Sequence, residues 1–194
     1  MASNTLSLVL VFCIYTIIAC TAYPSSNPSA FIKSSCSVTL YPSLCIQSLS
    51  SYADTIQENP KQMAQAALTV SLSVAKSVKV FVTKMSKSKG LKRIEYKVLK
   101  DCVDNVGDSV DRLSMSIQEL GHMGHGEENF IWHMSNAQTW VSAALTEENT
   151  CLDGFAGRGG MDGRLKTVIR SKITSVARVT SNALALVNRF AERH

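Results

Sequence analysis

The cysteines of this sequence are the residues whose chemistry, disulfide formation, can be inferred most directly. Four cysteines, Cys36, Cys45, Cys102 and Cys151, follow an apolar leader. Outside the cytosol such thiols form disulfides, and four of them allow three pairings. The short spacing of Cys36 and Cys45 favours a bridge between them, which leaves Cys102 for Cys151. Spacing alone does not decide between the three pairings.

Histidine and glutamate gather in one glycine-rich stretch and could together hold a metal ion. The residues are His122, His125, Glu127, Glu128 and His133. Their spacing is loose compared with that of known metal-binding motifs. We therefore expect an exposed polar loop here, with no metal and no other cofactor.

No group of residues in the sequence resembles a catalytic centre. Serine is common, but no serine lies in a Gly-x-Ser-x-Gly setting. A nucleophile, a base and a group that orients the base cannot be assembled from the sequence. An enzyme is therefore not expected.

Basic residues are concentrated between Lys84 and Arg93, in a chain whose formal net charge is +5. This stretch could bind a polyanion, although a solvated connection between helices is favoured. Nucleic acid is not expected as a partner, because the basic residues have no aromatic residues among them and the leader indicates secretion.

The leader itself is an uncharged apolar run from Leu6 to Cys20, followed by small residues. A membrane span needs about 20 apolar residues, so the run is short for one. It is typical of a signal peptide, with residues 1–22 removed after Ala22. The alternative is an uncleaved anchor. Cleavage removes Cys13 and Cys20 and leaves residues 23–194 as one domain, with no further membrane contact expected.

Four long helices are predicted in residues 59–194. Asn59-Pro60 is a typical helix start, with an N-cap residue followed by proline at the first helical position. The first helix then ends near the basic stretch before Gly90. The other three are predicted at Leu91–Leu120, Glu128–Thr150 and Arg164–Arg189.

Each long helix carries apolar residues at steps of three or four, which predicts one inward face per helix. For the first helix the predicted inward residues are Met63, Ala67, Val70, Val74, Val78 and Phe81. For the second they are Leu91, Ile94, Val98, Cys102, Val106, Val110, Leu113, Ile117 and Leu120. For the third they are Phe130, Met134, Ala137, Val141, Ala144 and Cys151. For the fourth they are Leu165, Ile169, Ile173, Val176, Ala183, Val187 and Phe190, with Thr180 as a polar interruption.

Two short helices, Pro28–Ser35 and Pro42–Ser50, are predicted to form a hairpin within residues 28–58. The fold class is therefore all-α. We expect an antiparallel up-down-up-down four-helix bundle, preceded by this short N-terminal helical hairpin and held by two disulfides.

Four segments, in order and suitably spaced, resemble the plant invertase and pectin methylesterase inhibitor family over essentially the whole mature chain. They are FIKSSCSVTLYPSLC, YKVLKDCVDNVGDSVDRL, NAQTWVSAALTEENTCLDGF and TSNALALVNRF. The resemblance implies a four-helix bundle behind a helical hairpin, with one disulfide in each part. It thus implies the pairs Cys36–Cys45 and Cys102–Cys151.

Two inhibitory activities occur in that family, one against pectin methylesterases and one against cell-wall or vacuolar acid invertases. Invertase-directed members often carry a Pro-Lys-Phe tripeptide, which this sequence lacks. The family's domain also occurs ahead of a methylesterase, but no such sequence follows here. The resemblance therefore favours a free-standing, secreted pectin methylesterase inhibitor of the cell wall, forming a 1:1 complex, with acid invertase as the alternative target.

The resemblance also implies that the second, third and fourth bundle helices cover the enzyme's substrate cleft. On the second helix, steps of three and four place Asp101, Asp104, Asp108 and Asp111 along one flank. These four residues are called the acidic line below. Such a line could steer docking to a basic enzyme, although a merely solvated face is the commoner meaning of such a pattern.

Four residues of the third helix complete the predicted interface. Thr150 matches the family position directly before the last cysteine, which is placed to contact the enzyme. Gln138, Ser142 and Asn149 are further candidates from the same helix. A third hypothesis, from another class, is a non-inhibitory wall protein that binds pectin through the stretch Lys84 to Arg93.

Overall fold

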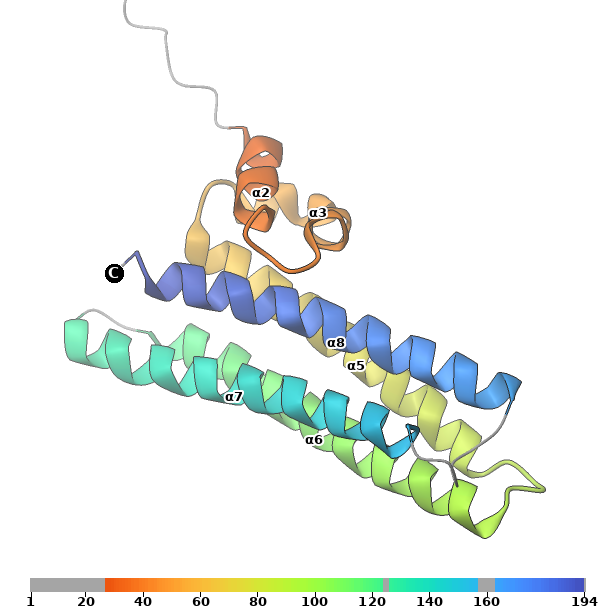
Figure 1. Cartoon of the computed structure of the whole chain (residues 1–194). Coiled ribbons are helices and arrows are strands. Elements are labelled where there is room, and N and C mark those ends of the chain that lie inside the picture. Colours follow the sequence, from red (N-terminus) through yellow and green to blue (C-terminus); the bar gives the residue numbers. More distant parts are fainter. Residues whose placement is uncertain (1–26, 124–125, 157–162, 194) are drawn as a thin grey trace, which may run out of the picture.

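The structure is a computed structural model, and it describes residues 27–123, 126–156 and 163–193. Every regular element in these ranges is a helix (Figure 1). The predicted signal peptide, residues 1–22, lies outside the described residues, as do His125 and most of the glycine-rich link before Gly163.

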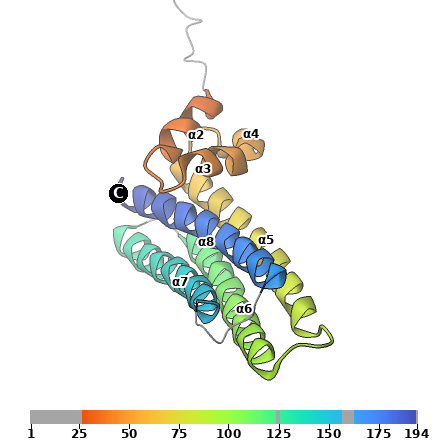
Figure 2. The same cartoon turned by 45° about the vertical axis from the view of Figure 1, so that its right-hand side comes forward.

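Four long helices form the body of the molecule. They are α5 (Pro60–Ser86), α6 (Arg93–His122), α7 (Glu127–Gly154) and α8 (Arg164–Ala191). Each runs antiparallel to the next, and α5 and α8 close the ring (Figure 2). The predicted all-α bundle is confirmed, and the most extensive interface is the one between α6 and α7.

Helix starts follow the local sequence. The Asn59 side chain accepts hydrogen bonds from the N–H groups of Lys61 and Gln62, at 2.9 and 3.1 Å, and so caps α5 as predicted. At the start of α6 the Glu95 carboxylate accepts the Lys92 N–H at 2.8 Å. The helix therefore begins at Arg93, and Leu91, predicted to be its first inward residue, lies before it.

The hairpin consists of α2 (Pro28–Cys36) and α3 (Pro42–Leu49), close to the predicted bounds. A 3₁₀ turn, η1 (Ser50–Tyr52), and a short helix, α4 (Ala53–Ile56), follow it and were not predicted. Both are too short to show a helical period. Ile56 at the end of α4 is fully buried, so this unpredicted element contributes to the core.

The inward faces predicted for α7 and α8 are largely correct, whereas those for α5 and α6 need correction. On α5, Val70, Val74 and Phe81 are only half-buried, while the neighbouring Leu68, Ala75 and Val82 are fully buried. The helix packs against both α6 and α8. The buried face of α5 is therefore directed between α6 and α8. It includes small residues, which a search for large apolar residues at steps of three or four does not identify.

The same correction applies to the first turns of α6. Ile94, predicted to point inward, is 47% exposed, and Leu99 is fully buried in its place. The first turns of α6 extend past the end of α7 (Figure 1), and Ile94 belongs to the first of these turns.

Among the described residues, α5 alone is long and apolar enough to cross a membrane by length and composition. It packs against α6 and α8 and also against α3 and α4 of the hairpin region, so it belongs to the core of the bundle.

Two disulfides hold these parts together. Cys36 bonds to Cys45 and closes the hairpin, with the two Cα atoms 5.6 Å apart. Cys102 bonds to Cys151 and joins α6 to α7, with a Cα separation of 4.6 Å. All four cysteines are buried.

The hairpin lies on the outer side of α5 and α8, near the C-terminal end of α8 (Figure 1). Ile32, Leu49 and Ile56 are buried in the same core cluster as the bundle residues. Asn182 of α8 makes a pair of hydrogen bonds with Tyr41. Its amide group donates to the Tyr41 carbonyl at 3.0 Å, and its side-chain oxygen accepts the Tyr41 N–H at 3.0 Å.

Candidate functional site

The acidic line lies on the outer surface of α6. All four of its side chains, from Asp101 to Asp111, are exposed. None has a hydrogen-bond or ion-pair partner within the described residues, whereas Arg112 beside them is paired with Glu147 of α7 at 3.2 Å. The four carboxylates are therefore fully available to an outside partner.

Thr150 is exposed on the last turns of α7, and its hydroxyl donates to the Thr146 carbonyl at 2.9 Å. Thr150 and Asp101 each directly precede one of the cysteines of the Cys102–Cys151 bridge. The bridge thus places these two predicted residues at the same level of the bundle, on adjacent helices.

Gln138 and Ser142, nearer the middle of α7, lie on the side of the helix that faces α8. The Gln138 amide donates to the Asn188 side chain of α8 at 3.0 Å. Gln138 and Ser142 both line a shallow open hollow between α7 and α8, together with Leu184. Asn149 is exposed near the end of α7. The predicted interface residues therefore divide between the outer flank of α6 and α7 and the flank of α7 and α8.

A carboxyl group that the sequence analysis missed lies inside the bundle. Glu148 of α7 is fully buried, and its Oε1 accepts hydrogen bonds from Ser109 of α6 at 2.7 Å and Thr180 of α8 at 3.0 Å. Its Oε2 is buried without a partner among the described residues. Burial raises the pKa of Glu148 to about 7, even though both hydroxyl groups favour the ionised form.

A signal for Glu148 was present in the sequence. The residue is four positions after Ala144 and three before Cys151, which puts it in phase with the inward residues of α7. The polar interruption at Thr180 was also visible, and the structure shows these two residues bonded to each other.

Among the residues that the structure describes, no group of three or more histidine, cysteine, aspartate or glutamate side chains is placed to hold a metal ion. His133 contacts Glu119 through Nδ1 at 2.6 Å, and the ring of His122 lies 5.9 Å from that of His133. Glu127 and Glu128 are exposed at the start of α7. The position of His125 is outside the described residues.

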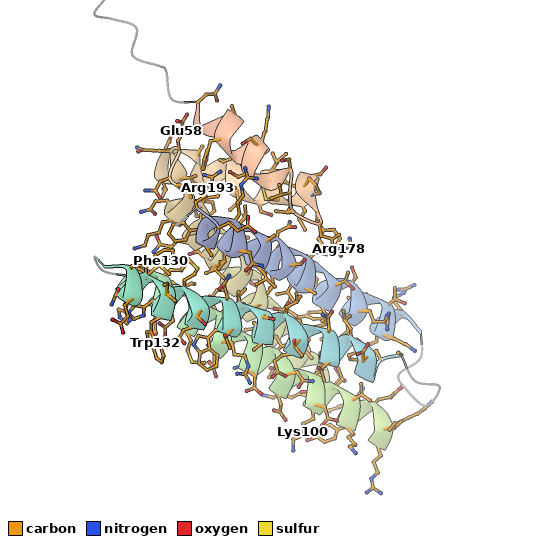
Figure 3. All side chains as sticks on the ribbon, turned by 60° about the vertical axis from the view of Figure 1, so that its left-hand side comes forward. Glu58, Lys100, Phe130, Trp132, Arg178 and Arg193 are labelled. Carbon is orange, nitrogen blue, oxygen red and sulfur yellow. A yellow bond between two sulfur atoms is a disulfide. The ribbon has the colours of Figure 1, made fainter. Side chains whose placement is uncertain are left out.

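The two tryptophans of α7 differ in exposure. Trp132 is 66% exposed and projects from α7 near its first turns (Figure 3). Trp140 is only half-buried, because its position on α7 is rotated away from the inward line through Ala137 and Val141.

The fold and the exposed polar face together define a disulfide-bonded, antiparallel four-helix bundle with an N-terminal helical hairpin. In the parts of the chain that the structure describes, it presents an acidic surface and holds no metal-binding cluster.

A sequence model described as plant invertase/pectin methylesterase inhibitor matches residues 30–186. The chain is 52% identical to "Pectinesterase inhibitor 9" of Arabidopsis thaliana, over 98% of this chain and 95% of that protein. It is 51% identical to the "21 kDa protein" of Daucus carota, over 91% of this chain and 90% of that protein. The chain belongs to the plant invertase/pectin methylesterase inhibitor family.

The fold agrees with solved structures. The crystal structure of mutant form A of a pectin methylesterase inhibitor from Arabidopsis matches with a TM-score of 0.62. The match covers 79% of this chain and 92% of that chain at 20% sequence identity, so it bears on the fold alone.

Proposed function

We propose that this protein is a secreted inhibitor of pectin methylesterase. The observation that carries the proposal is the 52% identity to "Pectinesterase inhibitor 9", which extends over nearly the full length of both chains. Residues 1–22 would be removed as a signal peptide. The mature domain, residues 23–194, would consist of the hairpin at 28–58 and the bundle at 59–194, and would act in the cell wall.

The mechanism we propose is steric. Helices α6 and α7, with the adjoining flank of α8, cover the substrate cleft of the enzyme and exclude pectin without any chemical step. Such an interface benefits from rigid elements, because little conformational entropy is then lost on binding. The Cys102–Cys151 bridge and the Arg112–Glu147 pair both fasten α6 to α7 and support this role.

The acidic line and Thr150 would form one part of the contact surface. The four carboxylates of the acidic line have no partner within the described residues, so they lose only hydration when they meet a basic enzyme surface. Gln138, Ser142 and Asn149 would extend the contact toward α8, where the hollow between α7 and α8 can receive a side chain of the partner.

The first experiment is a titration of the mature, oxidised protein against a plant pectin methylesterase and an acid invertase in parallel, at mildly acidic pH. We expect stoichiometric loss of methylesterase activity while invertase remains active. Loss of invertase activity alone would assign the protein to the other branch of its family, whose description covers both targets. Activity of both enzymes at saturating protein would refute inhibition of either.

A further inference from the structure

Positive charge is concentrated at one end of the bundle. The end of α5, the start of α6, the end of α7 and the start of α8 all lie there (Figures 1 and 2). The Cys102–Cys151 bridge joins α6 to α7 near this end, and Arg170 of α8 donates to the Leu152 carbonyl of α7 at 3.4 Å.

The basic pole is defined here as the cationic side chains of residues 84–100 together with Arg164. Lys84, Lys87, Lys89 and Lys92 come from the end of α5 and the connection that follows it, and all four are exposed. Arg93, Lys97 and Lys100 follow on the first turns of α6 and are exposed as well. Figure 3 shows Lys100 toward this end of the molecule, far from Phe130 and Trp132.

These charges are not neutralised inside the protein. No cation of the basic pole has a salt-bridge partner within the described residues. Glu95, the acid that lies among them, uses its carboxylate to accept the Lys92 N–H. Asp101, which directly follows Lys100, and Asp153 near the end of α7 are further exposed acids at this end. The cations of the basic pole outnumber these acids, so the net charge of this end is positive.

We propose that the basic pole binds de-esterified homogalacturonan, the linear polyuronate that carries one free carboxylate per sugar. The cations are spread over a connection and two turns of helix. An extended polyanion can follow such an arrangement, because binding of this kind needs a track of charge and no enclosed site. The choice of polyuronate rests on the proposed function, since hydrolysis of the methyl esters of pectin releases methanol and leaves these carboxylates.

Binding at the basic pole would hold the inhibitor on pectin that has already lost its methyl esters. The pole contains none of the residues proposed to contact the enzyme. Asp108 and Asp111 lie further along α6, beyond Lys100, the last α6 cation of the pole. They remain accessible while the polymer is bound, so the inhibitor could be held next to the regions where the enzyme works.

The test measures binding of a fluorescent oligogalacturonate of defined length to the mature protein, with no enzyme present. The test variant is Lys87→Gln/Lys89→Gln/Lys97→Gln. The matched control, Lys33→Gln/Lys76→Gln/Arg193→Gln, removes the same charge from exposed positions elsewhere. We expect affinity to fall about tenfold or more in the test variant, to change less than about twofold in the control, and to fall steeply with added salt. The methyl-esterified oligomer should not bind.

Three results would overturn the proposal. They are absence of wild-type binding at low salt, equal loss in both triple variants, and binding to anionic phospholipid vesicles without binding to oligogalacturonate. Equal thermal unfolding of the three proteins shows that the substitutions act locally. Because the assay contains no enzyme, a protein that binds the oligomer yet inhibits no methylesterase would keep this site and lose the proposed function.

Discussion

Glu148 is the residue whose environment departs furthest from that of an ordinary surface side chain. A carboxylate in a helical core loses its hydration, and two neutral hydroxyl donors restore only part of that loss. With Oε1 occupied by Ser109 and Thr180, the unpartnered Oε2 is the atom that would carry the proton. The protonated form is neutral and joins three helices of the bundle.

Stability is therefore expected to depend on pH through Glu148. Its pKa in the folded protein is raised to about 7, from 4.5 for a solvent-exposed glutamate, so the unfolded chain releases the proton at lower pH. The stability that the protonated group supports is complete below pH 4.5 and is lost as pH rises through about 7. We expect the free energy of unfolding to fall by an amount on the order of 3 kcal/mol. Urea denaturation at several pH values would measure this loss.

The variant Glu148→Gln provides the control, because its amide has nearly the same shape and does not titrate. We expect this variant to lose most of the decrease in stability between pH 5 and pH 7.5. Other titrating groups are common to both proteins and cancel in the difference. A decrease of the same size in the variant would show that Glu148 does not determine it.

For single residues, the sequence predicted which positions carry polar side chains better than it predicted their hydrogen-bond and ion-pair partners. Thr180 was recognised as a polar residue on an inward face, but its partner was not, because a hydrogen bond between α7 and α8 depends on the rotation and level of both helices. The acidic line could be recognised within one helix. The sequence could not show whether Arg112 neutralises this line. In the structure the arginine pairs with Glu147 of the next helix instead.

At the scale of the element, the acidic line of α6 makes the sharpest prediction about inhibition. Reversing two of its charges with Asp104→Lys/Asp108→Lys should weaken inhibition of a pectin methylesterase at least about tenfold, through loss of complementary charge at the interface. The measurement is the inhibition constant at low salt.

A matched control reverses two exposed acids elsewhere, as in Glu127→Lys/Glu128→Lys at the start of α7. Its net charge changes equally, so a difference between the two variants isolates the contribution of position. Unchanged inhibition by Asp104→Lys/Asp108→Lys would remove the acidic line from the mechanism.

The bridge between α6 and α7 should stabilise the protein more than the bridge in the hairpin. Cys102 and Cys151 are 49 residues apart in sequence, and Cys36 and Cys45 are 9 apart. The chain-entropy treatment then gives about 4 kcal/mol for the longer loop and about 2.5 kcal/mol for the shorter one. Urea denaturation of the two double Cys→Ala variants should show this order, and the reverse order would contradict the entropic explanation.

Helix positions could be predicted from the sequence, while the rotation of α5 and the inward residues in the first turns of α6 could not. The stripes of α7 and α8 each follow one line at steps of three and four, and nearly all of their residues are buried. On α5, the alternation of alanine, serine and valine provides several almost equivalent faces. Packing against α6 and α8 selects among these faces, and that selection buries Ser71 and Ala75.

At the scale of the whole molecule, the hairpin and the bundle share one hydrophobic core. Ile32 and Ile56 from the hairpin region are buried with residues of α5 and α8. The pair of hydrogen bonds between Asn182 and Tyr41 fixes the orientation of the hairpin on α8. We therefore expect the hairpin and the bundle to unfold together in one transition.

Replacing Asn182 tests this coupling. The variant Asn182→Ala leaves the Tyr41 N–H without a partner in a part-buried place, while the Tyr41 carbonyl still accepts the Cys45 N–H. The unsatisfied N–H should cost about 2 kcal/mol of unfolding free energy. Amide hydrogen exchange should accelerate in α2 and α3 more than in α6. Uniform acceleration in all helices would show that Asn182 supports the fold generally and has no special role in docking the hairpin.

The topology of the bundle followed from four amphipathic segments joined by short links, a pattern that few other arrangements satisfy. The position of the hairpin did not follow, because its place depends on contacts between residues more than a hundred positions apart, such as Tyr41 and Asn182. The short α4, which completes the hairpin region, lacks a sequence period altogether.

The bridge between Cys102 and Cys151 also closes a covalent ring that contains most of α6, the residues that link it to α7, and nearly all of α7. A single cut by a protease anywhere within this ring opens it but separates no fragment from the rest. A protein nicked between His122 and Glu127 would therefore remain one molecule, with both helices still attached at their far ends. It would migrate as an intact chain on a non-reducing gel and would separate into two pieces only after reduction.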